Sequence, residues 1–286
     1  MKQNCSSNMK KITETSEIGF CRRDILVALA CVIFLVTNLG LIGSTGRRRA
    51  KEAVCLSNIR EWGAIAEGHT QDNNGYFWAS DPGTPCYWWI KYLEEEYKDW
   101  KRNRIWFCPE GGEPMIDEYG NYSPSLTIFN AWGIYTGSGL GPNGISGSYG
   151  LNGYVLTPRP LGGGATKYEG GVSVTNGWKT PYVAGADNVP VFLDSLRFDV
   201  WPRETEAPAA SEHQAWTLSS MARCCINRHS GATNCLFMDW SARKVGLKEL
   251  WKLKWHRQFN TDGPWTQAGG VRPTYWPAWI RSFKDY

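Results

Sequence analysis

The sequence predicts an α+β protein in which one long N-terminal helix packs on an antiparallel β-sheet head with long loops. Three observations support this prediction. Residues 25–46 carry no charge, and residues 50–69 show the apolar spacing of an amphipathic helix. After residue 70 the chain becomes rich in glycine and aromatic residues, and the whole chain contains 31 glycines, 16 tryptophans and 13 tyrosines. This composition is typical of a loop-rich β domain with aromatic packing.

The uncharged run, residues 25–46, has the length of a membrane span. As a helix its 22 residues extend about 33 Å, which matches a hydrocarbon core of about 30 Å. A secretory signal has a shorter apolar region, and a buried core helix is normally interrupted by a charged face. We therefore expect a retained anchor. Five basic residues precede the run and five lie in residues 47–66, so the charge distribution gives no orientation.

The helix is expected to continue beyond the anchor as an amphipathic segment. Its apolar stripe consists of Cys55, Ile59, Trp62 and Ala66, spaced by four, three and four residues. The sequence "QDNNGY" at residues 71–76 is a turn signal at which the helix should stop. One face of this half of the helix would therefore cover a soluble domain.

The head is expected to combine short helices, short strands and two long loops. The loops are residues 133–150 and 159–177. The predicted elements are a helix at 84–100, a strand at 104–112, a buried strand at 189–195 that ends at Asp194, a hairpin at 234–247 and a short amphipathic helix at 246–260.

Six cysteines follow the apolar run: Cys55, Cys86, Cys108, Cys224, Cys225 and Cys235. In an exported domain they allow up to three disulfides. The pairing that we favour is Cys86 with Cys108, because these two residues flank one predicted helix–strand unit. The spacings do not resemble a paired C-x-x-C zinc site. We therefore predict some bridges, some buried thiols, no metal and no cofactor.

Several short motifs occur in a fixed order along the chain. They are Gly19-Phe20 with Asp24, "AKEAVCLSNIREWG" at 50–63, "DNNGYF" at 72–77, "SYGLNGYV" at 148–155, and His229 and Asp239 separated by nine residues. Together they resemble the type IV pilin and pseudopilin superfamily. The resemblance is closest to the bacterial group with a prepilin-type N-terminal segment and a C-terminal H-x9-DG motif.

The resemblance implies a chemistry for the N-terminus. A prepilin peptidase would cut after Gly19, the new amine of Phe20 would be methylated, and Asp24 would meet the amine of a neighbouring subunit. A charge inside an apolar medium needs such a partner. Arg22 and Arg23 depart from the family, which has apolar residues at these positions, so cleaved and uncleaved forms both remain open. Asp24 replaces the family's glutamate.

The resemblance also implies four segments and a function. The segments are a leader-like cytoplasmic part at 1–19, a transmembrane helix at 20–46, its amphipathic extension at 47–70 and an extracytoplasmic head at 71–286. The chain would be a non-enzymatic structural subunit of a type II secretion or type IV pilus-like assembly. It would cross the bacterial inner membrane once, and its partners would be like or related pilin subunits and the prepilin peptidase.

One alternative is an uncleaved bitopic protein whose tryptophan- and tyrosine-rich head binds polysaccharide. The simpler interpretation places most of these rings in the core. No nucleic-acid partner is expected, because the net charge is only +4 and much of it lies in "RRRAK" at 47–51.

An exported enzyme is not favoured, because the sequence contains no G-x-S-x-G, H-E-x-x-H or P-loop motif. His229 and Asp239 could form a dyad or a metal pair, but a hydrogen bond that braces the hairpin is the simpler interpretation. Trp240, in place of the family's final glycine, predicts a turn without a positive φ at that residue.

Overall fold

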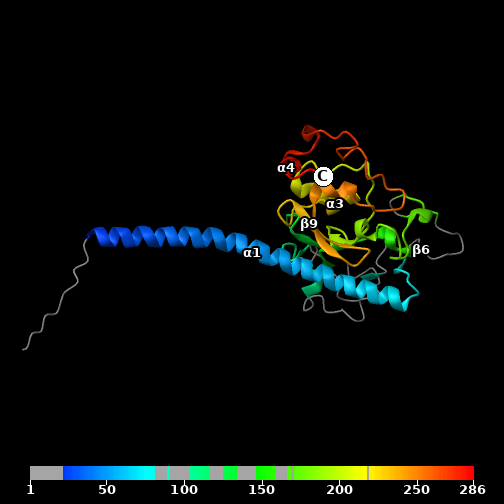
Figure 1. Ribbon diagram of the computed structural model, residues 1–286, viewed down its shortest axis with the longest axis horizontal. Helices are drawn as coiled ribbons and strands as arrows, with labels where there is room; N and C mark the ends of the chain where they lie inside the picture. The colour runs from blue at the N-terminus through cyan, green and yellow to red at the C-terminus, as the bar shows by residue number, and fades with distance from the viewer. Residues whose placement is uncertain are drawn as a thin grey trace, which may run out of the picture. The chain divides into compact units, whose positions relative to one another are not determined.

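The protein is described here by a computed structural model. The described residues are 22–80, 89–90, 104–115, 125–133, 146–158, 166–168, 171–217 and 219–286. The chain divides into two compact units, Met1–Arg47 and Arg48–Tyr286, and each is described by itself. All described strands belong to the second unit, where they accompany helical segments (Figure 1). The predicted α+β class is confirmed.

Helix α1 is assigned from Arg22 to Asp72, so it ends within the predicted turn signal. Asn74 and Gly75 follow with φ angles of 55° and 81°, and the N–H of Gly75 donates to the carbonyl of Thr70 at 2.7 Å. Left-handed residues after a helix satisfy its last carbonyl groups in this way.

The first unit contains the part of α1 that precedes Arg48. In the part of the chain that the structure describes, no helix is both long enough and apolar enough to cross a membrane. The predicted transmembrane segment, residues 20–46, begins outside the described residues. It stays a prediction.

The main sheet has the strand order β10-β9-β7-β5-β8. Its β5–β8 contact is parallel, and its other three contacts are antiparallel. The central strand β7 and its neighbour β9 are buried along their whole length, which confirms the predicted buried strand and the predicted hairpin. The bounds are β5 Tyr149–Asn152, β7 Pro190–Asp194, β8 Asp199–Val200, β9 Ala232–Phe237 and β10 Ala242–Gly246.

Two small sheets and several short helices complete the described part of the head. One sheet pairs β1 Ala79–Ser80 with β6 Thr157–Pro158, and the other contains β2 Glu113–Pro114, β3 Asn130–Gly133 and β4 Ser146–Gly147. The 3-10 helices are η1 Arg104–Trp106, η2 Gly153–Val155, η3 Val174–Asn176, η4 Ala186–Asn188, η5 Glu212–Thr217, η6 Leu247–Lys252 and η7 Pro273–Tyr275. The short α-helices are α3 Ser220–Cys224 and α4 Ala278–Arg281.

The second half of α1 packs on this sheet through the predicted stripe. The side chains of Cys55, Ile59, Trp62 and Ala66 are fully buried, which confirms the amphipathic face. Gly63 brings the helix backbone close to β9, because a Cβ added there would lie 2.8 Å from Leu236 Cδ1. Trp62 packs on Phe192 of β7 and on Trp106, and its indole N–H donates to the carbonyl of Ile105 at 3.0 Å.

Two predicted elements differ in the structure. Residues 104–112 were expected to form a strand, but they begin as the 3-10 helix η1. Three of their carbonyls accept from side chains of α1, since Asn58 donates to those of Arg104 and Phe107 and Trp62 donates to that of Ile105. The helix expected at 246–260 is the shorter η6, which ends at Lys252.

The expectation that Trp240 lies in a turn without a positive φ is wrong. Trp240 has a φ of 67°, in the left-handed region. Its N–H donates to the carbonyl of Phe237 at 3.0 Å, and the chain then enters β10. A left-handed residue lets a tight hairpin loop return to the ladder, and glycine adopts that conformation most easily. The Trp240 ring packs on Phe77, with the ring centroids 5.9 Å apart.

We expect Trp62→Ala in the full chain to lower the free energy of unfolding by about 3–5 kcal/mol, because it opens a cavity between α1 and the sheet. Arg60→Ala is the control, since Arg60 is exposed on the same helix. Urea unfolding followed by tryptophan fluorescence measures both. Equal effects of the two variants would contradict the packing of this face.

We expect Trp240→Gly to be more stable than Trp240→Ala by about 1 kcal/mol, because both remove the ring and only alanine keeps the left-handed strain. Trp265 is the control, since it is also half-buried but lies outside the left-handed region. At position 265 we expect the glycine variant to be less stable than the alanine variant. Melting temperatures of the four variants test this. If glycine were the more stable residue at both positions, or alanine at both, the left-handed strain at Trp240 would be refuted.

Candidate functional site

Four metal-ligating side chains from separate parts of the chain meet under helix α1. They are Cys55 of α1, Cys108 after η1, Asp194 at the end of β7 and His229 before β9. All four are buried, and one ligand atom of each lies within 4.8 Å of those of the other three. We call these four residues the Cys–Asp–His cluster.

Local structure explains why the four residues converge. Cys55 begins the buried stripe of α1, and Asp194 pairs with Tyr149 in the sheet register. His229 precedes two left-handed residues, Ser230 with a φ of 53° and Gly231 with a φ of 81°. This turn reverses the chain just before β9 and leaves His229 against the end of β7.

The cluster is compact. Cys55 Sγ lies 3.7 Å from Asp194 Oδ1 and 3.6 Å from Oδ2. His229 Nε2 lies 3.1 Å from Asp194 Oδ2 and 3.4 Å from Cys108 Sγ. Each residue therefore contacts at least one other member directly.

A buried arginine supports the carboxylate of Asp194. Arg228 Nη1 lies 3.5 Å from Asp194 Oδ1, and neither side chain is exposed. The guanidinium also donates to the carbonyls of Ile128 at 2.7 Å, Asn130 at 2.7 Å and Ser148 at 2.9 Å. Four bonds fix it in one orientation, and its charge faces the cluster.

Neutral donors surround the cluster as well. The Thr233 hydroxyl and the Asn234 N–H both donate to Asp194 Oδ2, at 3.4 Å and 3.2 Å. The Tyr149 hydroxyl donates to Cys55 Sγ at 3.4 Å. A carboxylate and a thiol sulfur are therefore both held by a second layer of hydrogen bonds.

The environment shifts the ionisation of the cluster. Burial alone would raise the pKa of Asp194, but the charges of His229 and Arg228 outweigh burial and hold that pKa well below its usual range. Burial would lower the pKa of His229, yet the charge and hydrogen bond of Asp194 raise it to about 10. Burial raises the pKa of the Cys108 thiol. His229 and Asp194 thus form a buried ion pair beside the Cys108 thiol.

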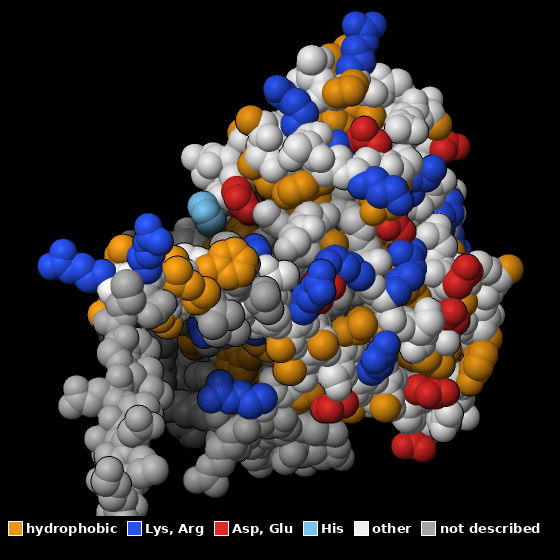
Figure 2. Space-filling model, turned by 60° about the vertical axis from the view of Figure 1, so that its left-hand side comes forward, with side chains coloured by type: hydrophobic (Ala, Val, Ile, Leu, Met, Phe, Trp, Pro, Cys, Tyr) orange, Lys and Arg blue, Asp and Glu red, His pale blue; other side chains and the backbone are white. Residues whose placement is uncertain are grey.

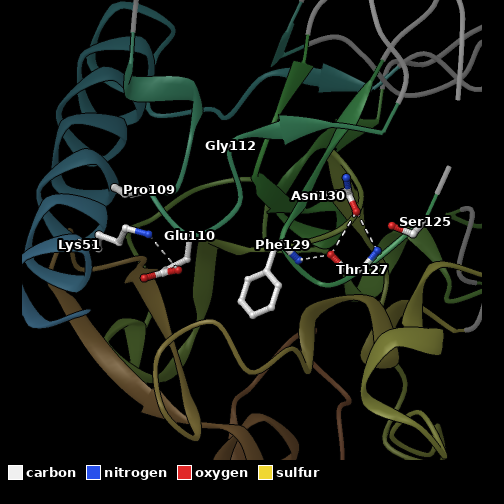
Figure 3. A pocket seen from close by; sticks show the side chains of 8 residues that line it. All are labelled: Lys51, Pro109, Glu110, Gly112, Ser125, Thr127, Phe129 and Asn130. Carbon is white, nitrogen blue, oxygen red and sulfur yellow. Dashed lines mark hydrogen bonds and ion pairs between the residues drawn. The ribbon is translucent and has the colours of Figure 1, made fainter. Parts of the chain in front are cut away.

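An exposed groove of about 500 Å³ lies beside the loop that carries Cys108 (Figure 3). On one side Lys51 of α1 points toward Glu110, with Lys51 Nζ 3.3 Å from Glu110 Oε2. Phe129 and Asn130 come from the opposite segment. Arg228 binds the backbone of that segment, so the groove and the cluster share a wall.

Of the predicted site residues, the structure describes the side chains of Cys108, His229 and Asp239. Gly19, Phe20 and Cys86 lie outside the described residues, and Asp24 lies in α1 with its side chain not described. The predicted Cys86–Cys108 disulfide stays a prediction, because Cys86 lies outside the described residues; the Cys108 thiol is buried and lies 3.4 Å from His229 Nε2.

The expected contact between His229 and Asp239 is also absent. Asp239 is exposed in the β9–β10 turn, where its carboxylate accepts from the N–H and the hydroxyl of Ser241. Strand β9 separates the two residues, and six residues of strand span about 20 Å. The partner of His229 is Asp194.

Sequence reasoning missed Cys55, Asp194 and Arg228 as members of one site. Cys55 was assigned to the apolar stripe, and Asp194 was recognised only as the end of a buried strand. The sequence did contain one sign of the site, which is the acidic residue Asp194 at the end of an otherwise apolar strand. A carboxylate at such a place needs a buried partner.

Comparison of the chain with protein-family models, with curated proteins and with solved structures finds no match in any of the three.

We expect Asp194→Asn to lower the free energy of unfolding by about 3–5 kcal/mol, because it leaves the Arg228 charge buried without its partner. Asp239→Asn is the matched control and should cost less than about 1 kcal/mol, since Asp239 is exposed. Urea unfolding of both full-length variants measures the difference. If Asp239→Asn lowered the free energy of unfolding more than Asp194→Asn, the assignment of Asp194 as the buried partner of His229 would be wrong.

Proposed function

We propose that the chain is a non-enzymatic, membrane-anchored structural subunit of a type II secretion or type IV pilus-like assembly. The observation that carries this proposal is the burial of the stripe Cys55–Ala66 of α1 against the main sheet, in which three of the four strand contacts are antiparallel. In the same helix, an uncharged run precedes that stripe. A pilin-like subunit needs this combination, since one helix must serve the membrane and hold the head.

The N-terminal residues define how such a subunit would be processed. In the proposal, prepilin peptidase cuts between Gly19 and Phe20, and Asp24 then pairs with the amine of a neighbouring subunit. Arg22 and Arg23 would lie near that amine, where burial in an apolar filament costs several kcal/mol unless they are paired or reach the interface. The chain would lie in the bacterial inner membrane with its head outside.

The surface of the head supports a role without nucleic acid. On the face in Figure 2, basic and acidic side chains are interspersed among apolar ones instead of forming one basic patch. A single-sign patch is the usual footprint of a nucleic-acid partner.

The described tryptophans give little support to the alternative of a polysaccharide-binding head. Of those that the structure describes, ten are buried and four are half-buried. The expectation that most rings belong to the core is confirmed for these residues. Stacking on sugars needs an exposed ring face, and every tryptophan that the structure describes is buried or half-buried.

The mature N-terminus tests the proposal. We expect mass spectrometry of the membrane-extracted chain to find N-methylated Phe20 as the first residue. Gly19→Leu should block cleavage, and Gly43→Leu should leave cleavage unchanged, since Gly43 has open space around it. A native chain that still begins before Phe20 would exclude pilin-type processing and favour the uncleaved bitopic protein.

Assembly is tested separately at Asp24. Asp24→Asn should reduce the sedimentable filament fraction at unchanged protein level, because it removes the charge that meets the amine. Asp24→Glu keeps that charge and should retain assembly.

A further inference from the structure

We propose that Cys55, Cys108, Asp194 and His229 bind one Zn²⁺ ion in a closed, four-coordinate structural site. This inference is independent of the proposed pilin-like function, because it rests only on the described interior of the head. Two thiolates, an imidazole and a carboxylate are ligand types that zinc accepts, and four protein ligands with no open position are typical of its structural sites.

Three of the six distances between ligand atoms are close to those around a tetrahedral zinc ion, and the other three are within 4.8 Å. With Zn–S of about 2.3 Å and Zn–N or Zn–O of about 2.0–2.1 Å, tetrahedral geometry puts a sulfur about 3.5 Å from a nitrogen or oxygen ligand. The structure has 3.6 Å between Cys55 Sγ and Asp194 Oδ2, and 3.4 Å between Cys108 Sγ and His229 Nε2. The same geometry puts nitrogen about 3.3–3.4 Å from oxygen. His229 Nε2 lies 3.1 Å from Asp194 Oδ2.

The charges of the site also fit. Two thiolates and one carboxylate carry three negative charges, so a divalent cation leaves one negative charge in the interior. Arg228 supplies the opposing positive charge, and its side chain is fully buried against Asp194. A buried charge without a partner is strongly unfavourable, so this arginine suits a metal-loaded cluster with net negative charge.

The surrounding donors correspond to the outer layer of a metal site. The Tyr149 hydroxyl donates to the sulfur of Cys55, and Thr233 and Asn234 donate to the carboxylate of Asp194. Such bonds orient ligands before the metal binds, and their loss usually weakens metal affinity.

The role of the ion would be to fasten helix α1 to the sheet. One ligand belongs to α1, one to the loop after η1, one to β7 and one to the turn before β9. These residues are far apart in the sequence, so a metal that joins them closes long loops of the unfolded chain. Binding to the folded head alone therefore adds directly to its stability.

Metal analysis of the full chain, purified in detergent with zinc in the growth medium and without chelator, tests the proposal. We expect about one zinc per chain, and Co²⁺ in its place should give the charge-transfer and d–d bands of a tetrahedral thiolate site. Cys55→Ser and His229→Gln should lose the ion. Cys235→Ala is the matched control and should retain it, because Cys235 is a buried free thiol that is not a member of the cluster.

A ligand exchange separates metal binding from folding. His229→Cys should still bind Co²⁺ and should raise the thiolate charge-transfer intensity by about half, since a third sulfur joins two. Chelator should lower the melting temperature of the native chain but not that of folded Cys55→Ser. Zinc content equal in the native chain and in Cys55→Ser would overturn the site. A native Cys55–Cys108 disulfide without bound metal, found by peptide mapping, would overturn it as well.

Discussion

The buried carboxylate of Asp194 is the group on which the arrangement of the head depends. It stands at the end of the central strand β7 and contacts Cys55 of α1, Arg228 and His229 before β9, and the backbone of Asn234 within β9. A charge at such a depth is stable only when every neighbour is in place, because an unpaired buried charge costs several kcal/mol. The helix, the loop after η1 and the β9 turn are therefore constrained by one side chain.

The apolar face of α1 and this polar cluster act together. The stripe Cys55–Ala66 is fully buried, but apolar packing tolerates small shifts of a helix along a sheet. Hydrogen bonds from Asn58 to the carbonyls of Arg104 and Phe107 and from Trp62 to Ile105 remove that freedom, since they need one register. The register of α1 on the head is therefore fixed by hydrogen bonds as well as by apolar burial.

Periodic features of the sequence were predictable and the convergence of distant residues was not. The stripe on α1, the stop after Asp72, the buried strand β7 and the β9–β10 hairpin follow from spacing and turn chemistry within short windows. The cluster depends on which loops cross one another, and no local pattern encodes that. The pairing of His229 with Asp239 failed because sequence proximity was taken for spatial contact across a whole strand. The left-handed φ of Trp240 was missed because the residue type was given more weight than the hairpin geometry.

Arg228 connects the Cys–Asp–His cluster to the exposed groove. Its guanidinium binds Asp194 on one side and the carbonyls of Ile128 and Asn130 on the other, and Asn130 lines the exposed groove. Gly111 completes the contact, since a Cβ there would lie 2.6 Å from the guanidinium carbon. The groove-lining residue Asn130 is thus linked through Arg228 to the carboxylate of Asp194.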